Sequence, residues 1–248
     1  MIKTAMIFAA GEGKRMLPLT LHTPKPLLKV AGKPLIFWHL ERLAAQGIQQ
    51  VVINVSYLGE QIMNAVQDGS AWGLKVIYSI EETPLETGGG LLKALPLLGE
   101  TPFLLVNGDV WCGELPEFPP LVNGEDALIF MQLVNNPSHN PDGDFCFASD
   151  SGQLTNKCSE AITSKTVTNK TTASKTFAGI SRIHPKMLDD KWLTAAYGQT
   201  FKAGDAFILS PLLRLMIDKQ RAKAAVFKGT WVDVGTPQRL ADLNASLL

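Results

Sequence analysis

The sequence predicts an α/β fold with a mixed, mainly parallel central sheet. In the first half, short apolar runs typical of buried strands alternate with stretches of helical length, the pattern of parallel strands joined by right-handed crossovers. In the second half, further strand-like runs follow at less regular spacing and predict the rest of the sheet. Because single α/β domains of this size are common, we expect one domain over residues 1–248.

The expected elements of the first half begin with a buried strand at 4–9, which ends in a glycine-rich turn. A helix at 34–45 has apolar residues near helical spacing and precedes Gly47, a residue type common after helix ends. We expect further strands at 50–55, 74–79 and 103–106, and further helices at 58–67 and 88–98.

The second half contains a helix at 207–219, with Pro211 in its first turn, and a last helix at 237–247 that Thr236 is placed to cap. Residues 163–176 are almost entirely Thr, Ser, Lys and Asn, which predicts a loop or a hairpin tip. The strands of this half are expected at 127–134, 176–183, 224–227 and 230–232.

Charge and hydrophobicity exclude several classes of protein. Lys and Arg together number 23, as do Asp and Glu, so the net charge is zero and a general nucleic-acid binder is excluded. With 46% hydrophobic residues, the composition argues against overall disorder. The apolar run at 5–10 is too short to span a membrane and is followed by charges, unlike a signal peptide. We expect a cytoplasmic protein without a membrane or nucleic-acid partner. Because the net charge is zero, the protein must bind any anionic ligand at a local site.

The three cysteines are Cys112, Cys146 and Cys158. Their odd number and the lack of C-x-x-C spacing argue against a disulfide scaffold or a zinc site. Both observations favour a reducing compartment.

The segment at 9–27 predicts a phosphate-binding loop. Gly11 and Gly13 follow the first strand and allow backbone N–H groups to approach a phosphate, while Arg15 and Lys25 supply two cations. The spacing matches neither the dinucleotide fingerprint nor the P-loop. The alternative is a surface loop whose cations are merely solvated.

Two carboxylates follow short strands in the motifs NGD and WVD. Magnesium usually takes one or two carboxylates together with substrate phosphate oxygens, and Asp109 and Asp233 provide such a pair if the fold brings them together. Taken singly, an Asp in this position more often forms a turn or caps a helix. In the segment at 82–90, three glycines open a helix and allow close approach by a flat base or a sugar, or simply loosen a turn.

Together these motifs resemble those of sugar-1-phosphate nucleotidylyltransferases. The string GEGKRMLPLT followed by PKPL is similar to the signature of that family, and the resemblance continues through PLETGGG, FLLVNGDVW, VNNPSHNPDGDF, FAGIS and WVDVGT. The combination of PLETGGG, GDVW and the VNNP to GDF segment narrows it to the N-acetylmuramate α-1-phosphate uridylyltransferase branch or a close relative.

The resemblance implies a Rossmann-like nucleotidyltransferase fold, with a nucleotide-binding half at about 1–110 and a sugar-binding half at about 111–248. It implies transfer of UMP from UTP to N-acetylmuramate α-1-phosphate, which gives UDP-N-acetylmuramate and pyrophosphate in peptidoglycan recycling. The implied cofactor is Mg²⁺, the partners are UTP and the sugar 1-phosphate, and we expect a monomer or a weak homodimer.

The resemblance also assigns roles to single residues. Arg15 faces the pyrophosphate leaving group and Lys25 the α-phosphate, as the catalytic residues. The implied nucleotide-binding residues are Ala10, Gly11, Gly13, Glu86, Thr87 and Gly88, the sugar-binding residues are Asn107, Asp144 and Gly179, and the metal ligands are Asp109 and Asp233. For Asp144 a turn-forming role is an equal alternative.

The sequence departs from the wider family in one motif. Many relatives carry an E-K-P triplet whose lysine binds the sugar phosphate, and no such triplet occurs between Asp109 and Phe177. The candidates for its role are Lys157, Lys165, Lys170 and Lys175. The four histidines show no metal-ligand spacing and are interpreted as structural or surface residues: His22, His39, His139 and His184.

Two other functions remain open at this point. One is a related transferase with another sugar or base, such as a mannose-1-phosphate guanylyltransferase or a glucose-1-phosphate uridylyl- or thymidylyltransferase. The other is a non-catalytic regulator that binds a nucleotide sugar. Such a regulator would be expected to lose a cation or a carboxylate, and this chain retains all four: Arg15, Lys25, Asp109 and Asp233.

Overall fold

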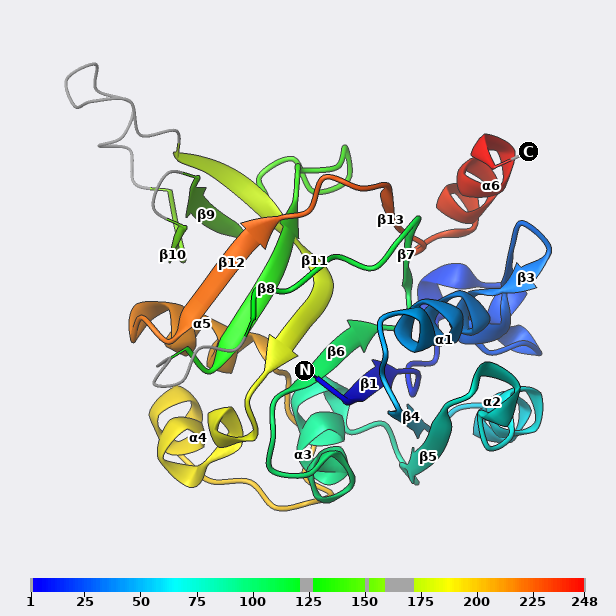
Figure 1. The fold of residues 1–248 in the computed structure, drawn as a ribbon, viewed down its shortest axis with the longest axis horizontal. Coiled ribbons are helices and arrows are strands. Elements are labelled where there is room, and N and C mark those ends of the chain that lie inside the picture. Colours follow the sequence, from blue (N-terminus) through cyan, green and yellow to red (C-terminus); the bar gives the residue numbers. More distant parts are fainter. Residues whose placement is uncertain (1, 121–126, 150–151, 159–171, 248) are drawn as a thin grey trace.

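The computed structural model describes residues 2–120, 127–149, 152–158 and 172–247 (Figure 1). Within these residues, a nine-stranded sheet has the order β10-β9-β11-β6-β1-β4-β5, and β8 pairs with both β11 and β12. Its strands are β1 (Thr4–Phe8), β4 (Gln50–Val55), β5 (Lys75–Ile80), β6 (Phe103–Asn107), β8 (Ile129–Val134), β9 (Phe145–Ala148), β10 (Gln153–Thr155), β11 (Thr172–Ile183) and β12 (Ala222–Val226). The strands β6-β1-β4-β5 are parallel, whereas β11 runs antiparallel to β6, β8 and β9. The predicted mixed, mainly parallel sheet is confirmed.

Helices cover both faces of the parallel strands. Successive side chains of a strand point to opposite faces of the sheet. Accordingly, Ile7 of β1 packs in the core formed with α1 (Leu35–Ala45) and α2 (Gly59–Val66), whereas Met6 packs in the core formed with α3 (Glu86–Leu98). The loops that follow β1, β4, β5 and β6 therefore gather at one edge of the sheet, where parallel sheets bind ligands.

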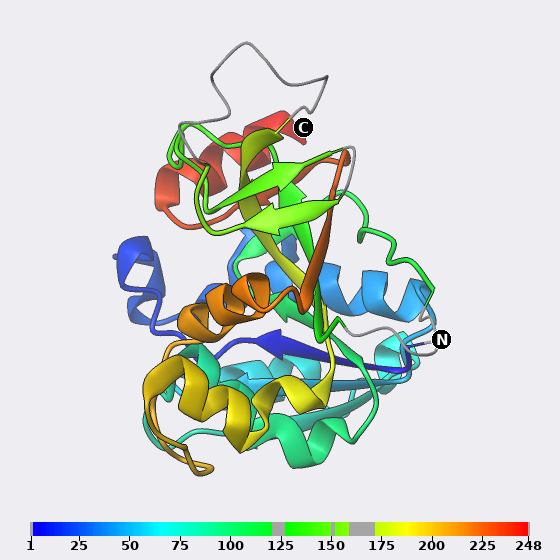
Figure 2. The ribbon, with the colours of Figure 1, turned by 90° about the vertical axis from the view of Figure 1, so that its left-hand side faces the viewer.

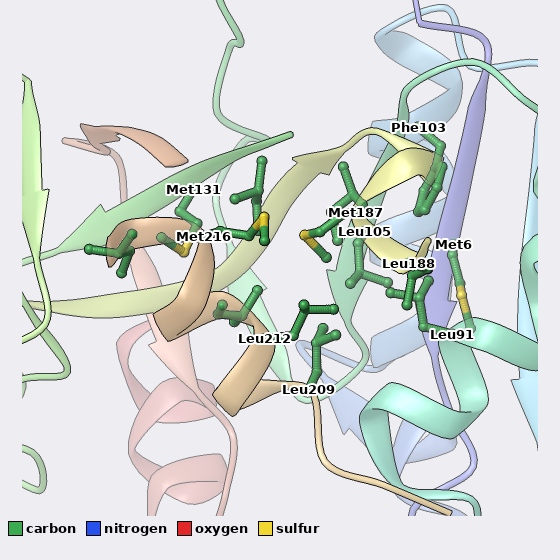
Figure 3. Packing of buried hydrophobic residues seen from close by; sticks show 14 of the residues in the cluster. Met6, Leu91, Phe103, Leu105, Met131, Met187, Leu188, Leu209, Leu212 and Met216 are labelled. Atoms are coloured by element: carbon green, nitrogen blue, oxygen red, sulfur yellow. The ribbon is translucent and has the colours of Figure 1, made fainter. Parts of the chain in front are cut away.

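The second half of the chain extends the core that contains Met6. Figure 3 shows α5 (Ser210–Asp218) lying against the sheet, with Met216 close to Met131 of β8. The same cluster includes Leu193 of α4 (Asp190–Tyr197). One hydrophobic core on this face of the mixed sheet thus contains residues from both halves of the chain.

A small two-stranded sheet carries one of the predicted metal ligands. It pairs β7 (Val110–Cys112) with β13 (Trp231–Asp233) in antiparallel register, so Asp233 lies opposite Val110. The chain then ends in α6 (Pro237–Ser246), which lies at the opposite end of the molecule from α4 in Figure 2. A third sheet pairs β2 (Lys29–Val30) with β3 (Lys33–Pro34).

Most expected elements are present with shifted ends. The helix expected at 207–219 begins at Ser210 with Pro211 in its first turn, and Thr236 caps α6 by accepting a hydrogen bond from the Arg239 N–H (3.3 Å). Among the described residues, five strands and one α-helix were not predicted: β2, β3, β7, β9, β10 and α4. Of the polar segment at 163–176, residues 163–171 lie outside the described residues, and the rest begins β11.

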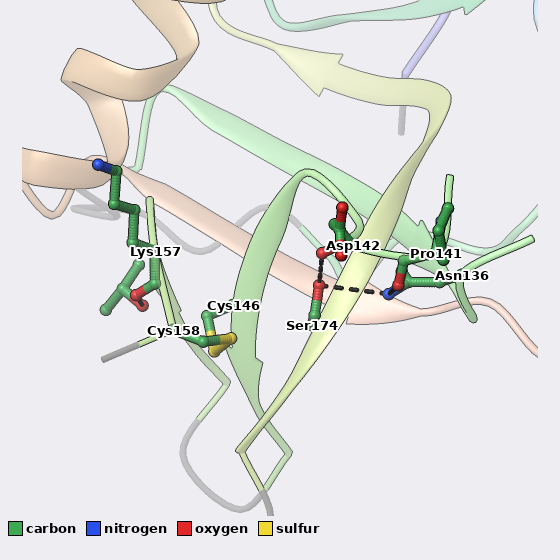
Figure 4. The surroundings of a disulfide bond; sticks show 8 residues. Asn136, Pro141, Asp142, Cys146, Lys157, Cys158 and Ser174 are labelled. Carbon is green, nitrogen blue, oxygen red and sulfur yellow. Dashed lines mark hydrogen bonds between the residues drawn. A yellow bond between two sulfur atoms is a disulfide. The ribbon is translucent and has the colours of Figure 1, made fainter. Parts of the chain in front are cut away.

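A disulfide joins Cys146 and Cys158, whose Cα atoms are 5.1 Å apart (Figure 4). This corrects the expectation drawn from the cysteine count. The reason is the unpredicted β9–β10 hairpin, which pairs Cys146 with Thr155 and brings the following residues back beside β9. The third cysteine, Cys112, is free and buried, and burial raises the pKa of its thiol to about 11. Among the described residues, no helix is long and apolar enough to cross a membrane.

Candidate active site

A cavity of about 460 Å³ lies at the edge of the sheet where β1, β4 and β6 end. Most of the predicted nucleotide residues line it, together with Lys25, Asn107 and Asp109. The full lining consists of Phe8, Ala9, Ala10, Gly11, Glu12, Gly13, Lys14, Arg15, Lys25, Pro26, Asn54, Glu81, Pro84, Glu86, Thr87, Asn107, Gly108 and Asp109.

The glycine-rich loop forms one wall of this cavity. The position where a Cβ of Gly11 would stand has no other atom within 4 Å, so a ligand can approach the backbone there. Gly13 is held by the Thr20 hydroxyl, which donates to its carbonyl oxygen (2.9 Å). Two exposed cations follow the loop: Lys14, which pairs with Glu12 (2.9 Å), and Arg15. The loop thus combines free backbone with positive charge, as phosphate binding requires.

A buried hydrogen-bond network ties three loops of the cavity together. The Ala9 N–H donates to Asn54 Oδ1 (2.8 Å), and Asn54 Nδ2 donates to Glu81 Oε1 (2.7 Å). The other oxygen of Glu81 accepts from the Leu85 N–H (2.9 Å). Asn54 and Glu81 are both at least 97% buried, so the network holds the ends of β1, β4 and β5 in a fixed arrangement. Sequence reasoning did not single out either residue.

Lys25 and Asp109 form an ion pair across the cavity. Lys25 Nζ lies 3.0 Å from Asp109 Oδ2, and only 11% of the lysine side chain is exposed. The turn that carries Asp109 lies against β1, because the Gly108 N–H donates to the Phe8 carbonyl (3.0 Å). A Cβ on Gly108 would stand 2.1 Å from that carbonyl oxygen, so only glycine allows this approach.

Two of the three glycines at the start of α3, Gly88 and Gly89, serve a different purpose from the one expected. The Gly88 N–H donates to the Phe207 carbonyl (2.8 Å), and a Cβ on Gly88 would stand 2.3 Å from the Phe207 ring. A Cβ on Gly89 would stand 2.1 Å from the Asp205 carbonyl oxygen. The close approach is therefore made by the chain's own segment at 205–207, not by a base or a sugar. Gly88 does not line the cavity, whereas Glu86 and Thr87 do.

Of the three residues expected to bind sugar, two lie together in the structure and the third, Asp144, lies apart from them. Gly179 of β11 lies directly against the Asn107 side chain, which lines the cavity. Asp144 lies outside the cavity lining, and its carboxylate accepts from the Phe177 N–H (2.8 Å) and from Asn140 Nδ2 (3.1 Å). These contacts match the turn-forming alternative for Asp144, and its contact with sugar stays a prediction.

Asp233 lines a second cavity, of about 820 Å³. Its Oδ2 accepts from Arg239 Nη1 (2.8 Å) and lies 3.2 Å from His139 Nε2. Its Oδ1 is buried and has no hydrogen-bond partner among the described residues. The backbones of the two predicted metal ligands are neighbours, since the Val234 N–H donates to the Asp109 carbonyl (2.8 Å). In the part of the chain that the structure describes, no group of three or more His, Cys, Asp and Glu side chains could hold a metal ion.

Comparison with known proteins identifies the family. The family model described as nucleotidyl transferase matches residues 4–136. The chain is 42% identical over 247 residues to the N-acetylmuramate alpha-1-phosphate uridylyltransferase of Neisseria meningitidis serogroup B, covering 97% of this chain and 96% of that one. The chain belongs to the nucleotidyl transferase family.

Two further relatives fit this membership. The mannose-1-phosphate guanylyltransferase catalytic subunit beta of Drosophila melanogaster is 31% identical over 245 residues, which cover 94% of this chain and 60% of that protein. The crystal structure of a UDP-glucose pyrophosphorylase with UDP-glucose superposes with a TM-score of 0.70 at 18% identity, covering 100% of this chain and 98% of that one. The predicted fold is thereby confirmed, and the chain is an enzyme of sugar-1-phosphate nucleotidyl transfer.

Family membership leaves three site features that sequence reasoning missed or left open. The Asn54–Glu81 network had a readable signal, an Asn inside an apolar strand and a Glu directly after the next strand. His139 was interpreted as structural or surface, yet it contacts a predicted metal ligand. Among candidates for the E-K-P lysine, Lys175 donates to Asn135 Oδ1 (2.7 Å). Lys157 is exposed, and Lys165 and Lys170 lie outside the described residues.

Proposed function

We propose that this nucleotidyltransferase transfers UMP from UTP to N-acetylmuramate α-1-phosphate and releases pyrophosphate, as a cytoplasmic enzyme of peptidoglycan recycling. The observation that carries the proposal is the Lys25–Asp109 ion pair (3.0 Å), which lines the same cavity as the glycine-rich loop. The uridylyltransferase relative, at 42% identity over nearly both whole chains, supports the choice of base and sugar. We further expect a monomer or a weak homodimer.

The first cavity would bind UTP. Backbone N–H groups at Ala10, Gly11 and Gly13 would hold phosphate oxygens, because the loop is open above Gly11. Arg15, which lines the same cavity, would face the leaving pyrophosphate. Glu86 and Thr87 line the same cavity and would contact the base, with Gly88 positioning them through its hydrogen bond to Phe207.

The sugar phosphate would approach from the side of Asn107 and Gly179, which lie together at the pairing of β6 with β11. One of its phosphate oxygens attacks the α-phosphorus of UTP in line with the bond to the β-phosphate. A new P–O bond forms as the bond to pyrophosphate breaks, so no protein nucleophile takes part. The chain contributes positioning and charge stabilisation, and Lys25 would meet the charge that develops at the α-phosphate.

Magnesium fits the carboxylates of this chain. Asp233 Oδ1 is a buried acceptor without a hydrogen-bond partner among the described residues, and the backbone of Asp233 lies next to that of Asp109. Magnesium usually takes one or two carboxylates plus phosphate oxygens, so these two side chains would hold it. When bound, the ion would neutralise negative charge on the phosphate oxygens.

The first alternative is a transferase with another sugar or base. Its support is the 31% identity to the guanylyltransferase subunit of Drosophila melanogaster, of which this chain covers 60%. The non-catalytic alternative is disfavoured because Arg15, Lys25 and Asp109 all line one cavity.

Pyrophosphate release in the presence of magnesium tests the proposal. UTP, GTP and dTTP are crossed with the 1-phosphates of N-acetylmuramate, N-acetylglucosamine, glucose and mannose. The proposal predicts the highest kcat/KM for UTP with the muramate sugar. A clear preference for another pair would still support nucleotidyl transfer but would refute the proposed specificity for UTP and the muramate sugar. Binding of nucleotide sugars without turnover of any pair would favour the regulator.

A further inference from the structure

The second cavity has no role in the steps above beyond Asp233. It lies between β13, α6, the chain after β12 and the loop after β8, and it shares no lining residue with the first cavity. Its lining consists of Val134, Asn135, Pro137, His139, Val226, Phe227, Lys228, Gly229, Trp231, Val232, Asp233, Arg239, Asp242, Leu243 and Ser246. At about 820 Å³ it is large enough for part of a substrate.

Among the described residues, one cation that lines this cavity is free to bind an anionic ligand. Three cationic or ionisable donors line it, and two of them, His139 and Arg239, already contact the same oxygen of Asp233. The third, Lys228, is exposed and forms no ion pair with any residue that the structure describes. The second acid in the lining, Asp242, accepts from Gln238 Nε2 (2.8 Å). Lys228 is therefore the donor that can take a new carboxylate without giving up a partner.

The cavity lies beside the region proposed for the sugar, and hydrogen bonds hold two parts of its wall. Trp231 Nε1 donates to the Ala178 carbonyl (2.9 Å), which fixes the indole beside Gly179. The loop that carries His139 is anchored to β11, because the Ser174 hydroxyl donates to the Asp142 carbonyl and accepts from Asn136 Nδ2 (Figure 4). The Trp231 indole and the loop that carries His139 are thus held by contacts within this chain.

We propose that this cavity binds the carboxylate arm of the sugar substrate. The inference rests on the proposed function, because N-acetylmuramate differs from N-acetylglucosamine by a lactyl ether on O3 that carries a carboxylate. With the sugar phosphate near Asp109 and Asp233, the arm extends past Asp233 into the second cavity. Its carboxylate binds Lys228 and His139, and its methyl group packs against Trp231.

This arrangement makes Lys228 a specificity residue. An ion pair of an exposed lysine is worth up to about fivefold in affinity, or about 1 kcal/mol. Only a substrate that carries the lactyl carboxylate can form this ion pair. A substitution of His139 would be a less informative test of specificity. His139 contacts Asp233, whose proposed role is the same for both sugars.

The test compares kcat/KM for N-acetylmuramate 1-phosphate and N-acetylglucosamine 1-phosphate, each with UTP, in the wild type and in Lys228→Ala. We expect the preference for the muramate sugar to fall about fivefold, through KM for that sugar alone. Lys228→Arg keeps the charge and should restore most of the preference, and Lys219→Ala, at an exposed lysine directly after α5, should leave it unchanged. Calorimetric affinities for UDP-N-acetylmuramate and UDP-N-acetylglucosamine should show the same selective loss without turnover.

The outcomes separate this inference from the proposed function. If the wild type shows no preference for the muramate sugar, the proposed function fails and this inference with it. If the wild type prefers that sugar but Lys228→Ala keeps the full preference, the inference alone is overturned. An equal loss for both sugars also overturns it, because Lys228 would then act on the shared part of the substrate.

Discussion

His39 should make the stability of this protein depend strongly on pH. Its imidazole is completely buried, and neither ring nitrogen has a hydrogen-bond partner among the described residues. Burial, and next the nearby Arg42 guanidinium, lower the pKa of His39 from 6.5 to about 4. The folded state thus keeps His39 neutral at pH values where the unfolded chain binds a proton. The contribution of neutral His39 to the free energy of unfolding is fully present above pH 6.5. It is lost as the pH falls toward 4.

Between pH 7 and pH 4.5, this difference in proton binding lowers the free energy of unfolding by about 2 kcal/mol. The assay is urea unfolding at both pH values for the wild type, His39→Gln and His22→Gln, which removes an exposed histidine. The pH-dependent loss should shrink by about 2 kcal/mol in His39→Gln and stay unchanged in His22→Gln. An identical loss in His39→Gln and the wild type would refute the reasoning.

Three further predictions concern single contacts that hold the fold together. Asn54→Ala removes two buried hydrogen bonds and should lower the free energy of unfolding by about 2–4 kcal/mol. It should also raise KM for UTP. An unchanged KM would show that the network does not position the glycine-rich loop. Gly89→Ala should lower stability by about 1–3 kcal/mol in thermal unfolding, because its Cβ would stand 2.1 Å from a carbonyl oxygen. Gly113→Ala, whose Cβ would have no other atom closer than 3.6 Å, is the matched control and should cost much less. Under oxidising conditions Cys146→Ser should lower stability by up to about 3 kcal/mol, and reductant should remove this difference.

The parallel half of the fold could be predicted because its signals are local. Strands such as β4 are short apolar runs, and the glycines of the first loop mark where β1 ends. The positions of Lys25 and Asp109 at one edge follow from the rule that loops after parallel strands gather there. Their direct contact at 3.0 Å confirms that the topology brings them together.

The remaining features depend on contacts between distant segments. The β9–β10 hairpin has strands of three and four residues, too short for a periodic pattern, so the pairing of Cys146 with Cys158 had no signal. Gly88 and Gly89 of α3 pack against a segment more than 100 residues later, which no local pattern indicates. His139 reaches Asp233 across 94 positions of sequence, and only the fold places it there.

Pyrophosphate release by Lys25→Ala tests the central claim most directly. The assay uses UTP, N-acetylmuramate 1-phosphate and magnesium, with circular dichroism to confirm folding and Lys75→Ala, an exposed lysine on β5, as the control. If Lys25 stabilises charge at the α-phosphate, kcat should fall by about 10²–10³-fold or more while the control stays near the wild type. A folded Lys25→Ala protein that turns over within a few-fold of the wild type would contradict the account.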